Sequence, residues 1–143
     1  MYLVDTNVIS AGAAALTNQP LVDWMDRNSE RLYLSTVTIA EIQDGIAKLR
    51  REGATRKAAS LTQWFETLLH LYAPRVLAFD VATARIAGAL SDVARAKGHA
   101  PGFADLSIAA TARAHGLILL TRNVKHFAPY GVTSHDPFAS LPK

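Results

Sequence analysis

Short apolar runs alternate along the chain with longer segments of helical periodicity. Four of the runs have the length of buried strands and cover residues 2–4, 32–34, 76–79 and 117–120, and a weaker run covers 132–133. Between them, apolar residues recur three or four positions apart, as they do on the buried face of a helix. The predicted helical faces consist of Leu21, Trp24 and Met25, of Ile39, Ile42, Ile46 and Leu49, of Leu61, Trp64, Phe65, Leu68, Leu69 and Tyr72, and of Ile86, Ala89, Leu90 and Val93.

This alternation predicts an α/β protein. Strands that alternate with helices pair in parallel, and the helices cover both faces of the sheet. We therefore expect a three-layer α/β/α sandwich with a mostly parallel sheet of about four to five strands, in which Gly98 and Gly116 end helices. Ligands of such sheets bind at the carboxyl ends of the strands. The polar residues that follow each strand are therefore the candidates for function.

The composition excludes several classes of protein. At 143 residues, half of them hydrophobic, the chain fits one folded domain over residues 1–143 and is not a low-complexity disordered sequence. It has no cysteine, which excludes disulfides, thiol nucleophiles and thiolate metal sites and fits a reducing cytoplasm. Neither a signal peptide nor an apolar run of membrane-spanning length is visible, so we expect a cytoplasmic protein without a membrane partner. The net charge of +3 is compatible with an RNA or DNA partner.

Three carboxylates follow the predicted strands or begin the next helices. Asp5 ends the first strand, Glu41 lies in the first turns of the helix after the second strand, and Asp105 opens a helix after a glycine-containing loop. Thr121 and Asn123 follow the fourth strand. Carboxylates that converge at one edge of a sheet repel one another without a cation, and oxygen ligands of this kind suit magnesium or manganese. The pattern therefore predicts a metal site.

Each of these residues also has a purely structural interpretation. Asp5 and Asp105 are of a residue type that caps helices, Glu41 alone would be a solvated helix residue, and Asn123 alone would be a turn residue. Their convergence favours the functional interpretation. Asp80, by contrast, fits a helix cap better than an active site.

Other catalytic motifs do not fit the sequence. There is no phosphate-binding glycine loop and no His-Glu-x-x-His pair, and Asn7 stands where a phosphatase of the haloacid-dehalogenase type needs a second Asp. His99 and His126 fit solvated loops. The basic segment 48–57 fits a solvated helix end, with contact to RNA phosphates as the alternative.

Four segments carry a resemblance to a known family. They read LVDTNVIS at residues 3–10, STVTIAEI at 35–42, ADLSIAATA at 104–112 and LLTRN at 119–123, and their order and spacing hold over nearly the whole chain. In these segments the chain resembles PIN-domain nucleases, in particular VapC-type toxins of bacterial toxin–antitoxin pairs. The resemblance implies a PIN-like fold and a metal-dependent nuclease site.

The resemblance also assigns roles to individual residues. It implies that Asp5, Glu41 and Asp105 are acidic active-site residues at the metal, with Asp5 and Asp105 as direct ligands. It implies polar support from Thr6 and Thr121. The predicted ion is Mg²⁺ or Mn²⁺.

Two positions depart from the family's pattern. Many relatives carry an acid at the position of Asn123 and an Asp at the position of His126. With three carboxylates in place of four, a tightly bound second metal is not expected. Asn123 could still hold a water ligand, and it is the fourth catalytic candidate.

These features predict a metal-dependent endoribonuclease that is the toxin of a toxin–antitoxin pair. Its partners would be an RNA substrate, a cognate antitoxin and a second copy of the chain in a homodimer. The alternative is a PIN-like module that binds RNA or metal with little or no cleavage, which the missing fourth acid favours. Trp24, Trp64 and Phe65 are predicted core residues, although the resemblance places an antitoxin groove and a dimer face on helices of that region.

Overall fold

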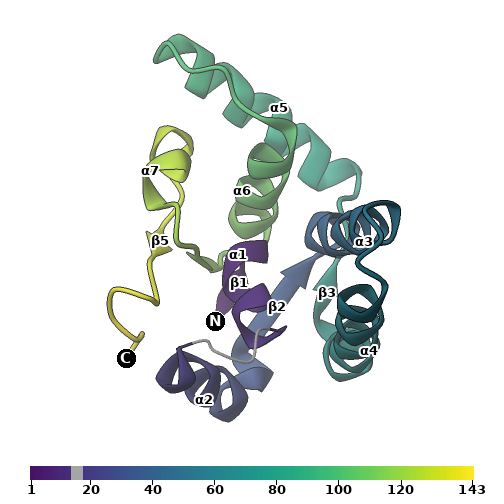
Figure 1. The fold of residues 1–143 in the computed structure, drawn as a ribbon. Coiled ribbons are helices and arrows are strands. Elements are labelled where there is room, and N and C mark those ends of the chain that lie inside the picture. The colour runs from purple at the N-terminus through teal and green to yellow at the C-terminus, as the bar shows by residue number, and fades with distance from the viewer. Residues whose placement is uncertain (14–17) are drawn as a thin grey trace.

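The computed structural model describes residues 1–13 and 18–143, and within these ranges it contains a parallel sheet of five strands (Figure 1). The strands are β1 (Tyr2–Val4), β2 (Leu32–Ser35), β3 (Val76–Leu77), β4 (Ile118–Leu120) and β5 (Ser134–His135). Their order across the sheet is β3-β2-β1-β4-β5, and every neighbouring pair is parallel. The N-terminal strand therefore lies at the centre of the sheet.

Helices fill the connections between the strands. Those in the described ranges are α1 (Thr6–Ile9), α2 (Gln19–Arg27), α3 (Thr36–Arg51), α4 (Thr55–Tyr72), α5 (Val81–Ala96), α6 (Phe103–His115) and α7 (Val124–Phe127), with short 3-10 helices η1 (Ser10–Ala13), η2 (Ser29–Arg31), η3 (Ala73–Arg75) and η4 (Ala128–Tyr130). Gly98 and Gly116 follow α5 and α6 with φ angles of +81° and +62°, so both predicted helix ends are confirmed. None of the helices in these ranges is long and apolar enough to cross a lipid bilayer.

The side chains of the central strands alternate between two hydrophobic clusters, one on each face of the sheet. On β1, Tyr2 and Val4 belong to the first cluster and Leu3 belongs to the second. Helices α2, α3 and α4 complete the first cluster, and α5, α6 and α7 complete the second. The predicted three-layer α/β/α sandwich is thereby confirmed.

Most of the predicted helical faces are buried as expected. All three predicted residues of α2 are buried, and Phe65, Leu68 and Tyr72 form the buried centre of the face of α4. On α3, Ile42 and Ile46 are buried. The i, i+3, i+4 spacing of apolar residues was therefore a reliable guide for these helices.

The prediction for α5 was only partly right. Of its predicted face, Leu90 is buried, whereas Ala89 is exposed and 42% of Val93 is exposed. The buried residues of the helix are Thr83, Ala87, Leu90 and Ala94. The buried Ala87 and Ala94 of α5 pack against the alanine-rich helix α6, so the buried face of α5 includes small residues that a search for large apolar side chains overlooks.

The last strand was predicted two residues too early. It was expected at 132–133, but β5 is Ser134–His135, where it pairs with Leu119 and Leu120 of β4. An edge strand is held by backbone hydrogen bonds along one side, so its own side chains can be polar. The apolar pattern therefore could not locate it.

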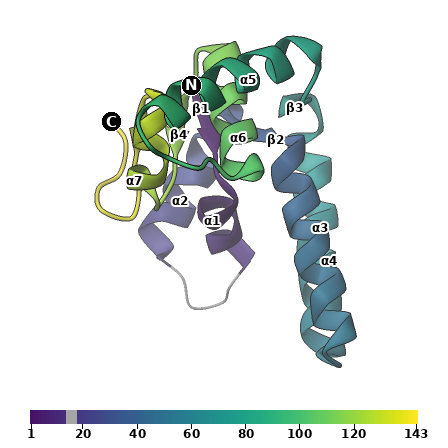
Figure 2. The ribbon, with the colours of Figure 1, turned by 90° about the horizontal axis from the view of Figure 1, so that it is seen from above.

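Helices α3 and α4 form an antiparallel pair that projects from the rest of the molecule (Figure 2). Gly53 makes the turn between them with a φ of +79°, and the Arg50 guanidinium donates a hydrogen bond to the Thr62 hydroxyl across the pair at 3.1 Å. We call this pair the arm, and residues 48–57 at its far end the arm tip.

Candidate active site

Asp5 lies at the carboxyl end of the central strand, and its side chain is fixed on both sides. Its Oδ1 accepts a hydrogen bond from the Thr6 N–H and its Oδ2 accepts one from the Thr121 hydroxyl, each at 2.8 Å. Only 5% of Asp5 is exposed, and Thr121 is fully buried at the end of β4. The Thr121 hydroxyl also accepts the Asn123 N–H at 3.0 Å. The edge formed by β1 and β4 thus holds one carboxylate in a single orientation.

The electrostatic surroundings of Asp5 disfavour its negative charge. Burial raises the pKa of the Asp5 carboxyl above its usual range, while the hydrogen bonds from Thr121 and Thr6 lower it. The negative charges of Asp105 and Glu41 raise this pKa further. The three acids predicted from the sequence are therefore near enough for their charges to interact.

Glu41 reaches this edge from the first half of α3. Its Oε1 accepts a hydrogen bond from the Thr6 hydroxyl at 2.7 Å, and the hydroxyls of Thr6 and Thr38 lie 3.1 Å apart. Glu41 itself is exposed, whereas Thr38 is fully buried. Thr6 therefore connects the turn after Asp5 to α3. The sequence interpretation missed Thr38, whose only signal is its place three residues before Glu41 on the same helix.

Asp105 lies inside the first turn of α6. The helix begins at Phe103 and its N-cap is Gly102, so Asp105 neither precedes the helix nor caps it, and that structural interpretation is wrong. The Oδ2 atom of Asp105 is 3.9 Å from Nδ1 of His126, and both side chains are well exposed. An acid in a first turn is favoured by the helix dipole.

Asp105 and His126 also line a pocket of about 290 Å³. Lys125, His99 and Tyr130 contribute to its wall. Burial and the charge of Asp105 raise the pKa of the Tyr130 hydroxyl. His99 and His126 were expected in solvated loops. His99 is exposed in the loop between α5 and α6, as expected, whereas His126 is exposed on helix α7. Both border this pocket together with Asp105.

The remaining candidates lie at or beyond the margin of the site. Asn123 is exposed, and although it precedes α7 its side chain makes no capping hydrogen bond. Asn7, which sequence reasoning did not assign, accepts the Arg122 N–H at 3.2 Å and ties the ends of β1 and β4 together. Asp80 accepts the Thr83 N–H at 2.9 Å as the N-cap of α5, so its prediction as a cap is confirmed.

The donor atoms near Asp5 are those that a hard divalent cation prefers. Carboxylate oxygens suit Mg²⁺ or Mn²⁺, and a cation would offset the mutual repulsion of the acids. Within the described ranges, no three acidic or histidine side chains are already arranged as a metal site. Glu41 is engaged by Thr6 and Asp105 lies beside His126, so both carboxylates would have to turn toward Asp5 to share an ion.

Replacing Thr121 with valine is expected to destabilise the fold by about 1 to 3 kcal/mol. Valine matches the shape of threonine but leaves Oδ2 of Asp5 and the Asn123 N–H without their buried partner. Urea denaturation measures the loss. The matched control is Thr111→Val, since the equally buried Thr111 hydroxyl donates only to the Ser107 carbonyl of its own helix. Equal losses in the two variants would contradict a special role for Thr121.

Comparisons with known proteins cover nearly the whole chain. The sequence profile of the PIN domain matches residues 2–130. The plasmid stability protein StbB of Pseudomonas syringae is 38% identical over 140 residues, which is 96% of this chain and 99% of that protein. The toxin FitB of Neisseria gonorrhoeae and the VapC ribonuclease Y4jK of Sinorhizobium fredii are each 34% identical over 139 residues, or 96% of this chain and 99% and 98% of theirs.

The fold agrees with the sequence comparison. The crystal structure of FitAcB from Neisseria gonorrhoeae matches with a TM-score of 0.86 and 36% identity, covering 96% of this chain and 99% of that one. The matched segment 2–130 includes the strand ends and helices that carry Asp5, Glu41 and Asp105. By sequence and by fold, the chain belongs to the PIN-domain family.

Proposed function

We propose that this protein is a metal-dependent endoribonuclease and the toxin of a toxin–antitoxin pair. The observation that carries the proposal is the buried Asp5 carboxylate, oriented by two hydrogen bonds and close to two further acids at the carboxyl ends of parallel strands. Relatives that match over nearly their full length include one named a toxin and one named a VapC ribonuclease. Because β5 extends the sheet beyond residue 130, we infer that residues 1–143 form one domain.

Asp5 and Asp105 would hold the ion, with Glu41 beside it. A bound Mg²⁺ or Mn²⁺ would supply positive charge at a phosphate oxygen and make a bound water more acidic. Thr121 and Thr6 keep the Asp5 carboxylate in one orientation, which lowers the entropic cost of assembling the site.

The exposed Glu41 carboxylate would orient the attacking water and accept its proton. The water oxygen would bond to phosphorus while the bond from phosphorus to the leaving ribose oxygen breaks, and that oxygen would take up a proton from solvent water. Lys125 and His126, beside Asp105, line a pocket in which the Lys125 ammonium group would contact a phosphate of the bound strand.

A PIN-like module that binds RNA or metal without cleaving remains the second candidate. It is favoured by Asn123 and His126, which stand where many relatives have acids, and by the need for Glu41 and Asp105 to turn before they share an ion. A cleavage assay separates the two functions. The proposed function predicts cleavage of RNA with Mg²⁺ or Mn²⁺ and none with EDTA. RNA that stays intact with either metal across tRNA, rRNA and mRNA would support the binding module.

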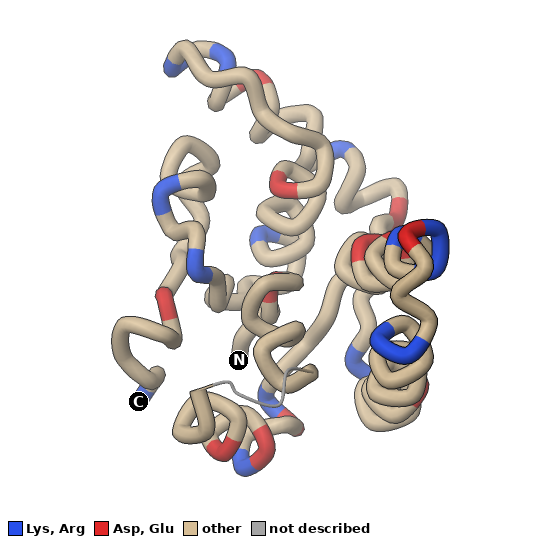
Figure 3. The backbone as a smooth tube through the Cα atoms, in the orientation of Figure 1, with Lys and Arg blue, Asp and Glu red and all other residues tan. Residues whose placement is uncertain are grey.

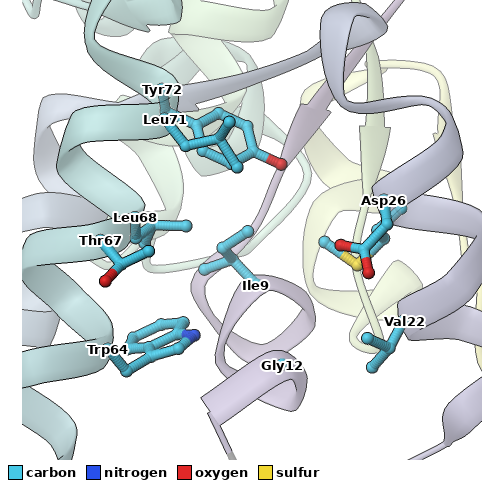
Figure 4. Close-up of a pocket in the computed structure, with 10 residues that line it drawn as sticks. Ile9, Gly12, Val22, Asp26, Trp64, Thr67, Leu68, Leu71 and Tyr72 are labelled. Atoms are coloured by element: carbon cyan, nitrogen blue, oxygen red, sulfur yellow. The ribbon is translucent and has the colours of Figure 1, made fainter.

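An apolar groove is the candidate binding site for the antitoxin (Figure 4). It has a volume of about 260 Å³ and lies between η1, α2 and α4. Ile9, Trp64 and Leu71 contribute apolar surface. Asp26 is the one acidic residue among the described residues that line the groove. Trp64 is only partly buried, as expected if it lines a groove rather than the core. We propose that an apolar helix or strand of the antitoxin lies here, with a basic residue opposite Asp26.

We further propose a homodimer that binds one antitoxin segment per subunit in this groove. Leu71→Glu is expected to weaken binding of the antitoxin about thirtyfold, because about 2 kcal/mol of apolar burial is lost. Light scattering measures the dimer, and calorimetry measures binding of a candidate antitoxin, such as the product of a small neighbouring reading frame. Leu141→Glu, at an exposed leucine outside the groove, is the control. A monomer, or equal affinity in both variants, would contradict this arrangement.

A further inference from the structure

The arm tip carries a concentrated excess of positive charge. Its five cationic side chains and one carboxylate give residues 48–57 a net charge of +4, whereas the whole chain carries +3. Figure 3 shows this basic cluster where α3 turns into α4. The segment projects away from the sheet, so little of this charge is neutralised by the rest of the fold.

Few of these cations are paired within the arm. The Lys48 Nζ atom lies 4.0 Å from Oε1 of Glu52, and the Arg50 guanidinium donates a hydrogen bond to the Thr62 hydroxyl. In the part of the chain that the structure describes, Arg51, Arg56 and Lys57 form no ion pair. These three side chains are therefore available to an anion.

The start of α4 adds to the positive potential. Arg56 and Lys57 lie in its first turn, where the helix dipole already favours negative charge. The N-cap is Ala54, which makes no side-chain hydrogen bond to the first N–H groups. A shallow hollow of about 510 Å³ lies over this turn, lined by Gly53, Ala54, Thr55, Arg56, Lys57 and Ser60. Cations gathered at the positive end of a helix are unfavourable unless an anion joins them.

The chemistry of the tip fits a polyanion better than a protein partner. Protein interfaces depend on large apolar or aromatic anchors. The described residues with large exposed apolar side chains all lie elsewhere, at Met1, Leu71, Val81, Val93, Phe103 and Leu141. RNA phosphates need only the charges and donors that the tip presents.

The same helix links the tip to the candidate active site. Glu41 lies near the start of α3 and Arg51 at its end, which places the tip about 15 Å further along the helix axis. We propose that the arm tip binds the phosphate backbone of the substrate RNA outside the cleaved bond. The tip thereby favours RNAs that are long enough to contact the arm tip and the candidate active site at the same time. This inference rests on the proposed ribonuclease function.

The test compares two triple variants that each remove three positive charges from exposed positions. The tip variant is Arg51→Gln, Arg56→Gln and Lys57→Gln, and the control is Arg27→Gln, Arg85→Gln and Arg95→Gln. Binding of a long structured RNA is measured against salt concentration, with Asp5→Asn added to prevent cleavage. We expect the tip variant to bind about tenfold more weakly and the slope of log Kd against log salt to fall by about 2 to 3. The control should change little.

Cleavage by the same triple variants without Asp5→Asn separates this inference from the function on which it rests. The tip variant should cleave a tetranucleotide at the wild-type rate but show a raised KM for the long RNA. Equal behaviour of the tip and control variants on the long RNA would overturn the role of the tip. Weaker binding of the antitoxin by the tip variant, with unchanged RNA binding, would overturn it in favour of an acidic protein segment. A wild-type protein that binds the long RNA through the tip but cleaves nothing would contradict only the proposed catalysis.

Discussion

Replacing Asp5 with asparagine is expected to slow RNA cleavage about a thousandfold or more while the protein stays folded. The substitution removes a ligand charge where an ion worth several kcal/mol of transition-state stabilisation would bind, and each 1.36 kcal/mol is about tenfold in rate. Asparagine still accepts the Thr6 N–H, and the Thr121 hydroxyl can reverse its role to accept from the new amide. Single-turnover cleavage and a thermal melt measure the two effects. Growth arrest on expression in a bacterium should disappear in parallel.

The matched control for this loss is Asp80→Asn. Asp80 also caps a helix, and the substitution changes the charge by the same amount, but it lies at the start of α5 and not at the acidic cluster. The control should cleave RNA at the wild-type rate. Wild-type activity in Asp5→Asn would contradict the assignment of Asp5, and equal loss in both variants would indicate a general effect of charge.

Asp105→Asn is expected to abolish stabilisation by metal while changing the metal-free protein little. A cation at about a hundred times its Kd stabilises the folded state by about 2.7 kcal/mol, which corresponds to about 9 °C for a chain of this length. In the metal-free variant, Asp5 loses a repulsive neighbour worth about 1 kcal/mol. The helix α6 loses a favourable first-turn charge of about 0.3 to 1 kcal/mol, so the two changes nearly offset.

Thermal melts with and without Mn²⁺ measure this response in the wild type, in Asp105→Asn and in Asp92→Asn. Asp92 is an exposed acid on the neighbouring helix α5, and its variant should keep the full shift. A full metal shift in Asp105→Asn would mean that Asp105 is not a ligand. The loss of the shift in Asp92→Asn as well would indicate nonspecific ion binding.

The parallel sheet and the place of Asp5 were predictable because their signals are local. Asp5 directly follows three buried strand residues, and the end of a parallel strand is where polar ligand groups gather. The order of the strands could not be predicted. Leu3 pairs with Tyr33 on one side and with Leu119 on the other, and no local pattern distinguishes these partners from other buried residues.

The polar support of the site was harder to predict than its acids. Thr38 and Asn7 act through hydrogen bonds to residues far away in the sequence, and threonine and asparagine have many structural uses. The alternative interpretation of Asp105 as a helix cap is wrong because α6 begins earlier, at Phe103, whose side chain is 68% exposed. An exposed aromatic gives no periodic signal for a helix start.

The central position of β1 bears on when the site is completed during synthesis. Thr121, which orients Asp5, is 116 residues later in the chain. At about 5 to 20 residues per second, a ribosome needs roughly 6 to 23 s to add that stretch. Of the two neighbours of β1 in the sheet, β2 is synthesised early in this interval and β4 at its end. The last residue that lines the groove between η1, α2 and α4 is Tyr72, so all of its lining residues have been synthesised at that point. All residues that line the groove are therefore synthesised before Thr121, the residue that completes the support of Asp5.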